Sequence, residues 1–263
     1  MENRRLSLLY NLQNFYNTSS AGSVDYQLSA YLIDNYKEIA RLNIFDVSEA
    51  NNVSRASVRR FCHNLGYQNF KDLKEHFAEF NEGFDLYVDF YSQEHFLHEL
   101  RKQIELMFKE LEERLSNREL KQIVESIYRS DEVVIIASST IANSIRVFQQ
   151  TMAIFGKRIS IVVSRERLDD LKNYLTNNSL ILFFSISGTL AESFIDRLLN
   201  KDFNILLFTN SRNPIFNQHF QRIYHLTSME NQSNRDIIYY TYGITYVLDS
   251  IVHQYSELIL RGK

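Results

Sequence analysis

The spacing of hydrophobic positions along the chain changes near residue 80. Before that point apolar residues recur three or four positions apart, as at Val58, Phe61 and Leu65 or at Phe70 and Leu73. This is the spacing of residues on one face of a helix. No segment there alternates between apolar and polar residues as a half-buried strand does, so this part of the chain predicts an all-helical domain.

After about residue 130, short runs rich in β-branched and aromatic residues alternate with helical patterns. These runs are "EVVIIA", "RISIVV", "LILFF", "NILLFTN" and "RIYHLT". Strands that alternate with helices form parallel sheets with helices on both faces. We therefore expect an α/β domain with a five-stranded parallel sheet, preceded by a helix that continues over 106–128 and closed by an amphipathic helix over 234–260.

The change of pattern also predicts the domain boundaries. Residues 1–77 form the helical domain and residues 106–263 the α/β domain. The polar and aromatic stretch between them, 78–105, is expected to be a linker that enters a further helix.

Composition narrows the class of protein. A chain of 263 residues with 44% hydrophobic content can bury substantial cores. It has no run of about 18 apolar residues and its N-terminus is polar, so we expect a cytoplasmic protein with no membrane partner. Its single cysteine, Cys62, excludes an intrachain disulfide and a multi-cysteine zinc site. No metal or cofactor is predicted.

The net charge of −3 conceals a local basic region. Between Val53 and Lys74 there are five basic residues and one acidic residue, a balance of +4. They are Arg55, Arg59, Arg60, Lys71 and Lys74, with Asp72 as the acid. A basic segment of this kind is typical of an anionic partner.

The segment 46–66 predicts two helices joined by a tight turn. A short helix is expected to open at Val47 and to break at Asn51 and Asn52. Asparagine tolerates the left-handed backbone that such a turn requires. Ser54 is expected to cap the second helix by accepting a hydrogen bond from the amide of Ser57.

The second helix has two different faces. Val58, Phe61, Cys62 and Leu65 fall on one side and predict a core contact, whereas Arg55 and Arg59 fall on the other with His63. An arginine-rich face is often only a solvated surface. The turn, cap and apolar spacing together are those of a helix-turn-helix, which favours DNA as the partner.

The stretch "SLILFFSISGTLAESF", 179–194, predicts a strand, a loop and a helix. Its loop carries Ser185, Ser187, Gly188 and Thr189. At the carboxyl end of a parallel strand, such a loop meets the amides at a helix N-terminus, which bind anions such as phosphate. An ordinary capped helix with polar loop residues remains the alternative.

Two resemblances add to this reading. The string "VSRASVRRFCHNLGYQNFKDLKEHF", 53–77, strongly resembles the N-terminal domain of RpiR-type bacterial transcriptional regulators, although Asn51 and Asn52 replace the usual small residue and glycine of the turn. The resemblance implies a DNA-binding domain over 1–77. It implies phosphate contacts by Ser54 and Ser57 and base contacts by Arg55 and Arg59. For Arg60, the resemblance implies either a contact with DNA or a pairing within its own domain.

The loop 185–189, followed by "NILLFTNSRNP", looks like a sugar isomerase (SIS) domain, which binds phosphosugars. The resemblance implies that Ser185, Ser187 and the Gly188–Thr189 backbone hold the phosphate. In the first loop, "ASSTIANS", both glycines of the family are absent. The residues expected to face the sugar there are Ser138, Ser139 and Thr140. The last threonine of the family's serine loop is Leu190 here.

Together these features predict a regulator and not an enzyme. Its partners are expected to be double-stranded operator DNA, a phosphosugar effector and further copies of itself in a homodimer or homotetramer. Two alternatives remain: a SIS-fold sugar-phosphate isomerase, or a regulator whose SIS domain only dimerises. By residue type, the candidates for isomerase acid–base chemistry are Glu192, His219, His225 and Glu230.

Overall fold

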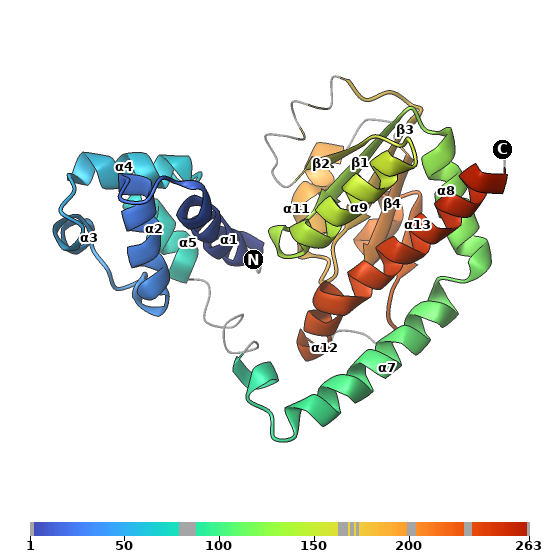
Figure 1. The fold of residues 1–263 in the computed structure, drawn as a ribbon, viewed down its shortest axis with the longest axis horizontal. Coiled ribbons are helices and arrows are strands. Elements are labelled where there is room, and N and C mark those ends of the chain that lie inside the picture. The colour runs from blue at the N-terminus through green and yellow to red at the C-terminus, as the bar shows by residue number, and fades with distance from the viewer. Residues whose placement is uncertain are drawn as a thin grey trace. The chain divides into compact units, whose positions relative to one another are not determined.

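The structure is a computed structural model, and we describe residues 3–78, 88–162, 168, 171, 174–198, 204–228 and 233–261. The chain divides into two compact units, Met1–Asp85 and Leu86–Lys263, each with its own helices (Figure 1). Within the described ranges, no helix has the length and apolar character needed to span a bilayer.

The described part of the first unit is helical, as the sequence predicts. Its helices are α1 (Asn3–Thr18), α2 (Val24–Asp34), α3 (Ile44–Ala50), α4 (Arg55–Asn64) and α5 (Phe70–Ala78), with a 3₁₀ turn at Tyr36–Glu38. Leu12, Leu28, Phe61 and Leu73 are buried in one core. Burial of such side chains on four helices contributes about 1.5–3 kcal/mol each and holds the unit together.

Helix α3 begins earlier than the sequence suggested. It starts at Ile44, three residues before the expected Val47. The reason is Asn43, whose side-chain oxygen accepts hydrogen bonds from the amides of Phe45 and Asp46, at 2.8 and 3.0 Å. An asparagine cap satisfies amides that a helix start otherwise leaves unpaired.

The second unit alternates strands and helices. Its strands are β1 (Glu132–Ala137), β2 (Ile159–Val162), β3 (Ser179–Phe184), β4 (Asn204–Thr209) and β5 (Arg222–His225). Its longer helices are α7 (Phe96–Arg114), α8 (Asn117–Arg129), α9 (Ala142–Ile154), α11 (Thr189–Leu198), α12 (Ser233–Ile238) and α13 (Ile244–Arg261). Short turns lie at Ser139–Ile141 (η2), Pro214–Gln218 (η3) and Tyr239–Gly243 (η4).

The helix expected over 106–128 is two helices. It breaks between α7 and α8 because Ser116 and Glu119 form a capping box, in which each side chain bonds the other residue's backbone amide. This pair satisfies two amides at the start of α8 and fixes the new helix there.

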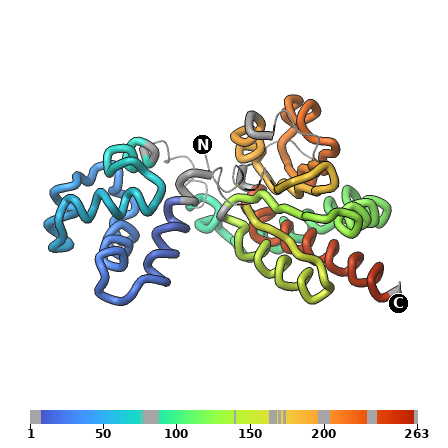
Figure 2. Tube along the Cα trace, turned by 90° about the horizontal axis from the view of Figure 1, so that it is seen from above, coloured from blue at the N-terminus to red at the C-terminus, as the bar shows by residue number. Residues whose placement is uncertain are grey.

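The five strands form one parallel sheet in the order β2-β1-β3-β4-β5, which confirms the predicted fold class. Alternate strand residues enter two cores. One core, including Ile135 and Phe184, lies against α8, α9 and α13. The other, including Ile181 and Phe183, lies against α11 and η3. Figure 2 shows α9 and α13 lying along the same side of this unit.

This strand order places the switch point of the sheet between β1 and β3, because β2 lies on one side of β1 and all later strands lie on the other. Ligands of open parallel sheets bind at such a point, beyond the carboxyl ends of the strands. The register pairs Ala137 with Phe184. The first residues after these strands are Ser138 and Ser185, which therefore begin the two loops at this edge.

Candidate functional site

The turn between α3 and α4 is closed by backbone hydrogen bonds. Asn52 has a left-handed φ of 51°, as its residue type predicts. Its amide donates to the carbonyl of Glu49 at 3.1 Å, and the amide of Val53 donates to the carbonyl of Ser48 at 3.0 Å. These two bonds are the Schellman pattern, which ends α3 and directs the chain into α4.

Helix α4 is capped by Ser54, as predicted. The Ser54 Oγ accepts the amide of Ser57 at 3.1 Å and lies 3.0 Å from the Ser57 Oγ. The two serines thus form one hydroxyl pair at the first turn of α4. Their predicted contact with phosphate stays a prediction.

The two faces of α4 lie where the sequence places them. Val58, Phe61 and Cys62 are buried, and burial raises the pKa of the Cys62 thiol to about 12. On the opposite face Arg55, Arg59 and Arg60 are all exposed. Within the described residues no ion pair engages these three arginines, so α4 presents its positive charge to solvent.

One contact of this surface was missed by the sequence analysis. The guanidinium of Arg55 lies over the ring of Phe45, 4.7 Å from its centroid, and Phe45 itself is 60% exposed. A cation over an aromatic face is worth about 0.5–1 kcal/mol at an exposed site. The ring on α3 therefore holds Arg55 at the N-terminal end of α4. The exposure of Phe45 cannot be read from the sequence, so no local pattern indicates this contact.

In the second unit, the loop between β3 and α11 is held by its own hydrogen bonds. The Ser185 Oγ accepts the amide of Ala191 at 3.1 Å and is buried, so this hydroxyl caps α11. Gly188 has a φ of +87°, and a Cβ on it would lie 2.6 Å from the Cβ of Ser211. The loop thus needs glycine at 188 both for conformation and for space.

The hydroxyl of Tyr240 is hydrogen-bonded to Ser187 of this loop. It accepts the amide of Ser187 at 3.4 Å and donates to the Ser187 Oγ at 3.3 Å. The Ser187 Oγ in turn donates to the Thr189 Oγ1 at 3.2 Å. The hydroxyl of Tyr240, a side chain on η4, therefore accepts from the Ser187 amide as an oxygen of a bound anion would.

The first loop lies at the same edge of the sheet. Ser138 is 6% exposed and its Oγ has no hydrogen-bond partner among the described residues. Residues Ser139–Ile141 form the turn η2, in which Thr140 is half-buried, and η2 contacts η4. At the end of β4, Asn210 is also buried with its Oδ1 unpartnered, while its Nδ2 donates to Asp236. The loops after β1 and β3 thus both contact η4.

The acid–base candidates are dispersed. The Glu192 Oε1 accepts from the Asn213 Nδ2 at 2.7 Å, and His219 ends η3. Burial, followed by the charges of Arg212 and Arg114, lowers the pKa of His225, which lies on β5. Glu230 lies outside the described residues. Across the described ranges, no three histidine, cysteine, aspartate or glutamate side chains gather as metal ligands would.

The first unit matches a known family. Residues 8–80 match the model of a helix-turn-helix domain of the rpiR family. A sequence search of curated proteins found no match.

The solved structures that are similar to this chain include the following three. One is the Vibrio vulnificus NanR protein complexed with ManNAc-6P, with 16% identity, a TM-score of 0.49 and coverage of 95% of this chain and 92% of that one. Another is the sugar isomerase domain of the RpiR transcription factor from Sphaerobacter thermophilus, with 14% identity, a TM-score of 0.44 and coverage of 62% and 93%. The third, from Methanococcus jannaschii, has an inferred 3-hexulose-6-phosphate isomerase function, 12% identity, a TM-score of 0.40 and coverage of 63% and 87%.

Proposed function

Because residues 8–80 of this chain match the model of a helix-turn-helix domain of the rpiR family, we propose that the protein is a transcriptional regulator that binds operator DNA and responds to a phosphorylated sugar. The observation that carries the DNA-binding part is the exposed arginine edge of α4, which stands opposite its buried core face. An amphipathic helix with this edge suits the major groove.

The residues of α4 take different roles in this proposal. Arg55 and Arg59 read base edges, since arginine donates two parallel hydrogen bonds to guanine. Ser54 and Ser57 donate their hydroxyls to the phosphates that flank the groove. Arg60 is exposed beside Arg59 and contacts the backbone.

Substitution of Arg55 tests the reading of bases. A duplex selected by the intact protein from a random-sequence pool serves as the operator, and a scrambled duplex of equal length as the reference. Arg55→Ala should weaken binding to the selected duplex by about 1–3 kcal/mol, or roughly 5- to 150-fold, and change binding to the scrambled duplex little. Arg41→Ala, which removes another exposed arginine of the same unit that is paired with Glu38, is the control. An equal loss on both duplexes would assign Arg55 to the backbone.

For the second unit we propose that the effector's phosphate binds at residues 185–189, through the hydroxyls of Ser185 and Ser187 and the backbone of Gly188 and Thr189. The first turn of α11 adds the positive end of its dipole. The sugar lies against Ser138, Ser139 and Thr140. The position of both loops at the switch point supports this assignment, as does the unpartnered Ser138 Oγ, because buried hydroxyls without a partner are rare.

Isomerase activity ranks second. The hydrogen bond between Glu192 and Asn213 and the place of Glu192 in the first turn of α11 give this carboxylate a structural use at a helix N-terminus. A DNA-binding unit requires a ligand signal and not turnover. Incubation with a panel of sugar phosphates, followed by analysis of the products, decides between the two, and formation of an isomer would reverse our ranking.

The remaining features of the proposal follow from its DNA partner. The regulator acts in the cytoplasm as a homodimer or homotetramer, because two reader helices must match half-sites about one DNA turn apart. Residues 1–77 form its DNA-binding domain, 78–105 its linker and 106–263 its SIS domain.

A further inference from the structure

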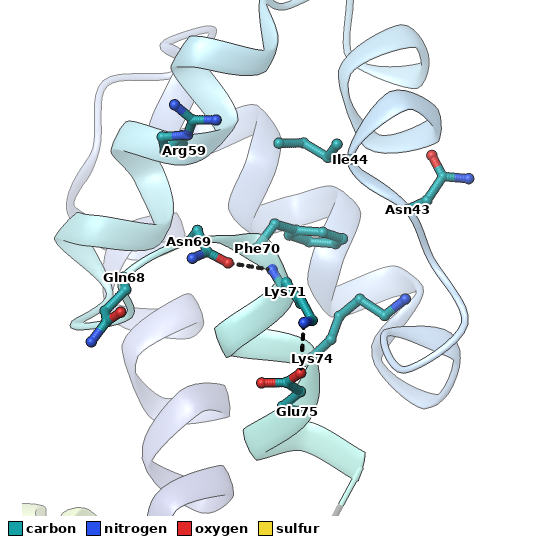
Figure 3. A pocket seen from close by; sticks show the side chains of 9 residues that line it. All are labelled: Asn43, Ile44, Arg59, Gln68, Asn69, Phe70, Lys71, Lys74 and Glu75. Carbon is teal, nitrogen blue, oxygen red and sulfur yellow. Dashed lines mark hydrogen bonds and ion pairs between the residues drawn. The ribbon is translucent and has the colours of Figure 1, made fainter.

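A groove of about 750 Å³ opens on the helix-turn-helix unit beside α4 (Figure 3). It lies between the start of α3, the exposed edge of α4 and the first turns of α5. Its lining residues are Asn43, Ile44, Arg59, Gln68, Asn69, Phe70, Lys71, Lys74 and Glu75. Phe70 is 4% exposed, so its floor belongs to the folded core of the unit.

The rim of the groove is positively charged. Three of its lining residues are cations, Arg59, Lys71 and Lys74, and Glu75 is its one carboxylate. Glu75 lies 3.4 Å from the Lys71 Nζ, and both side chains are more than 60% exposed. An exposed pair of this kind contributes at most about 1 kcal/mol, so Lys71 can exchange this carboxylate for a stronger anion.

Local hydrogen bonds fix where the two lysines stand. Asn69 caps α5, its Oδ1 accepting the amides of Lys71 and Asp72 at 2.9 and 3.0 Å. Leu73 is fully buried in the core. With Leu73 held inward, Lys71 and Lys74 are three residues apart on one side of α5, and both line the groove.

Arg59 connects this groove to the reader helix, because it lines the groove and lies on the exposed edge of α4. If the major groove of a duplex received α4, the position of Arg59 would bring one sugar-phosphate backbone close to the mouth of the groove. We propose that Lys71 and Lys74 bind phosphates of that backbone and form a second, sequence-independent part of the DNA interface. This inference rests on the proposed DNA binding.

The test is the salt dependence of DNA binding by the full chain. The selected and the scrambled duplexes are titrated with the wild type and with a Lys71→Ala/Lys74→Ala variant between 0.05 and 0.4 M salt. Each lost phosphate contact lowers the slope of log K against log salt by about 0.9. The double variant should therefore lose about 1.8 of slope per bound chain and bind both duplexes about 10- to 30-fold more weakly at 0.15 M salt. Circular dichroism verifies that the variant is folded.

Lys37→Ala is the matched control, since it removes an exposed lysine of the same unit that does not line the groove. It should leave slope and affinity unchanged. If wild type selects an operator but the double variant keeps the wild-type slope, the groove does not bind DNA and the inference is wrong. A loss on the selected duplex alone would also contradict it. Failure of the wild type to select any sequence would instead overturn the proposed function.

Discussion

At the scale of single residues, Gly188 in the loop between β3 and α11 has little room for a side chain. Its positive φ disfavours any side chain, and an added Cβ would lie 2.6 and 2.8 Å from the Cβ and Oγ of Ser211 and 3.2 Å from the ring of Phe216. The first effect costs roughly 1–2 kcal/mol and the second about 1–3 kcal/mol.

Gly188→Ala should therefore lower the free energy of unfolding by about 2–5 kcal/mol in urea denaturation of the full chain. Gly156→Ala is the control. It has a similar φ of +80° but nothing within 4 Å of the added Cβ, so it should lose only about 1–2 kcal/mol. An equal loss in both variants would mean that Ser211 moves away freely and that Gly188 is needed for its backbone alone.

Residues governed by their sequence neighbours were predictable. Asn52 in the turn and Ser54 at the cap act through bonds to residues within four positions of them, and residue type alone indicates both. Tyr240 was not predictable, because its partner Ser187 lies 53 positions away. Contacts at such separations depend on how helices pack over the sheet, which no local pattern contains. The loop between β3 and α11 could therefore be predicted, but not its contact with Tyr240.

At the scale of elements, the tail expected to be one amphipathic helix is interrupted. Between α12 and α13 the chain forms the single π-helical turn η4, Tyr239–Gly243. Such turns are rare and frequent at functional sites. A Cβ on Gly243 would lie 3.1 Å from the Sδ of Met107, so η4 packs closely on α7.

The π turn also brings two adjacent tyrosines to different partners. Tyr240 reaches the ligand loop, whereas the Tyr239 hydroxyl donates to buried Glu110 of α7 at 2.5 Å. Glu110 accepts further hydrogen bonds from Thr227 and Ser228. A ligand that displaced Tyr240 would therefore act on an element anchored to α7, whose first ten residues, 96–105, fall within the predicted linker.

Tyr240→Phe tests whether this hydroxyl competes with a ligand. Its loss frees the Ser187 amide to donate to a phosphate oxygen, and a neutral hydrogen bond of this kind contributes about 1 kcal/mol. Calorimetric titration with inorganic phosphate and glucose 6-phosphate should give a dissociation constant about 5-fold lower than in the wild type. Tyr242→Phe, on the same turn and 39% exposed, should change nothing. Weaker binding by Tyr240→Phe would instead identify the tyrosine as a ligand contact.

At the scale of the whole molecule, the fold class was predictable and the strand order was not. Five apolar runs alternating with helices predict a parallel sheet, and each run became a strand. The order β2-β1-β3-β4-β5 depends on the side of the sheet to which each crossover adds its next strand. The apolar runs do not encode that side. That order is what brings the loops after β1 and β3 to one edge of the sheet, so the candidate site can be recognised only in the assembled unit.

The proposed regulator requires that its two units be coupled, and coupling of two binding equilibria is reciprocal. If a sugar phosphate changes the affinity of the full chain for the selected duplex by a factor of about 5–150, the duplex must change the affinity for that sugar phosphate by the same factor. We expect equal factors when the duplex is titrated with and without saturating sugar phosphate, and the sugar phosphate with and without duplex, at one fixed salt concentration.

The isolated second unit should bind the sugar phosphate with the affinity of the DNA-free chain. Sugar-phosphate binding that leaves the duplex affinity unchanged would mean that the second unit senses without signalling. The absence of any sugar-phosphate binding, judged by the thermal shift that a native-state ligand must produce, would leave dimerisation as its role.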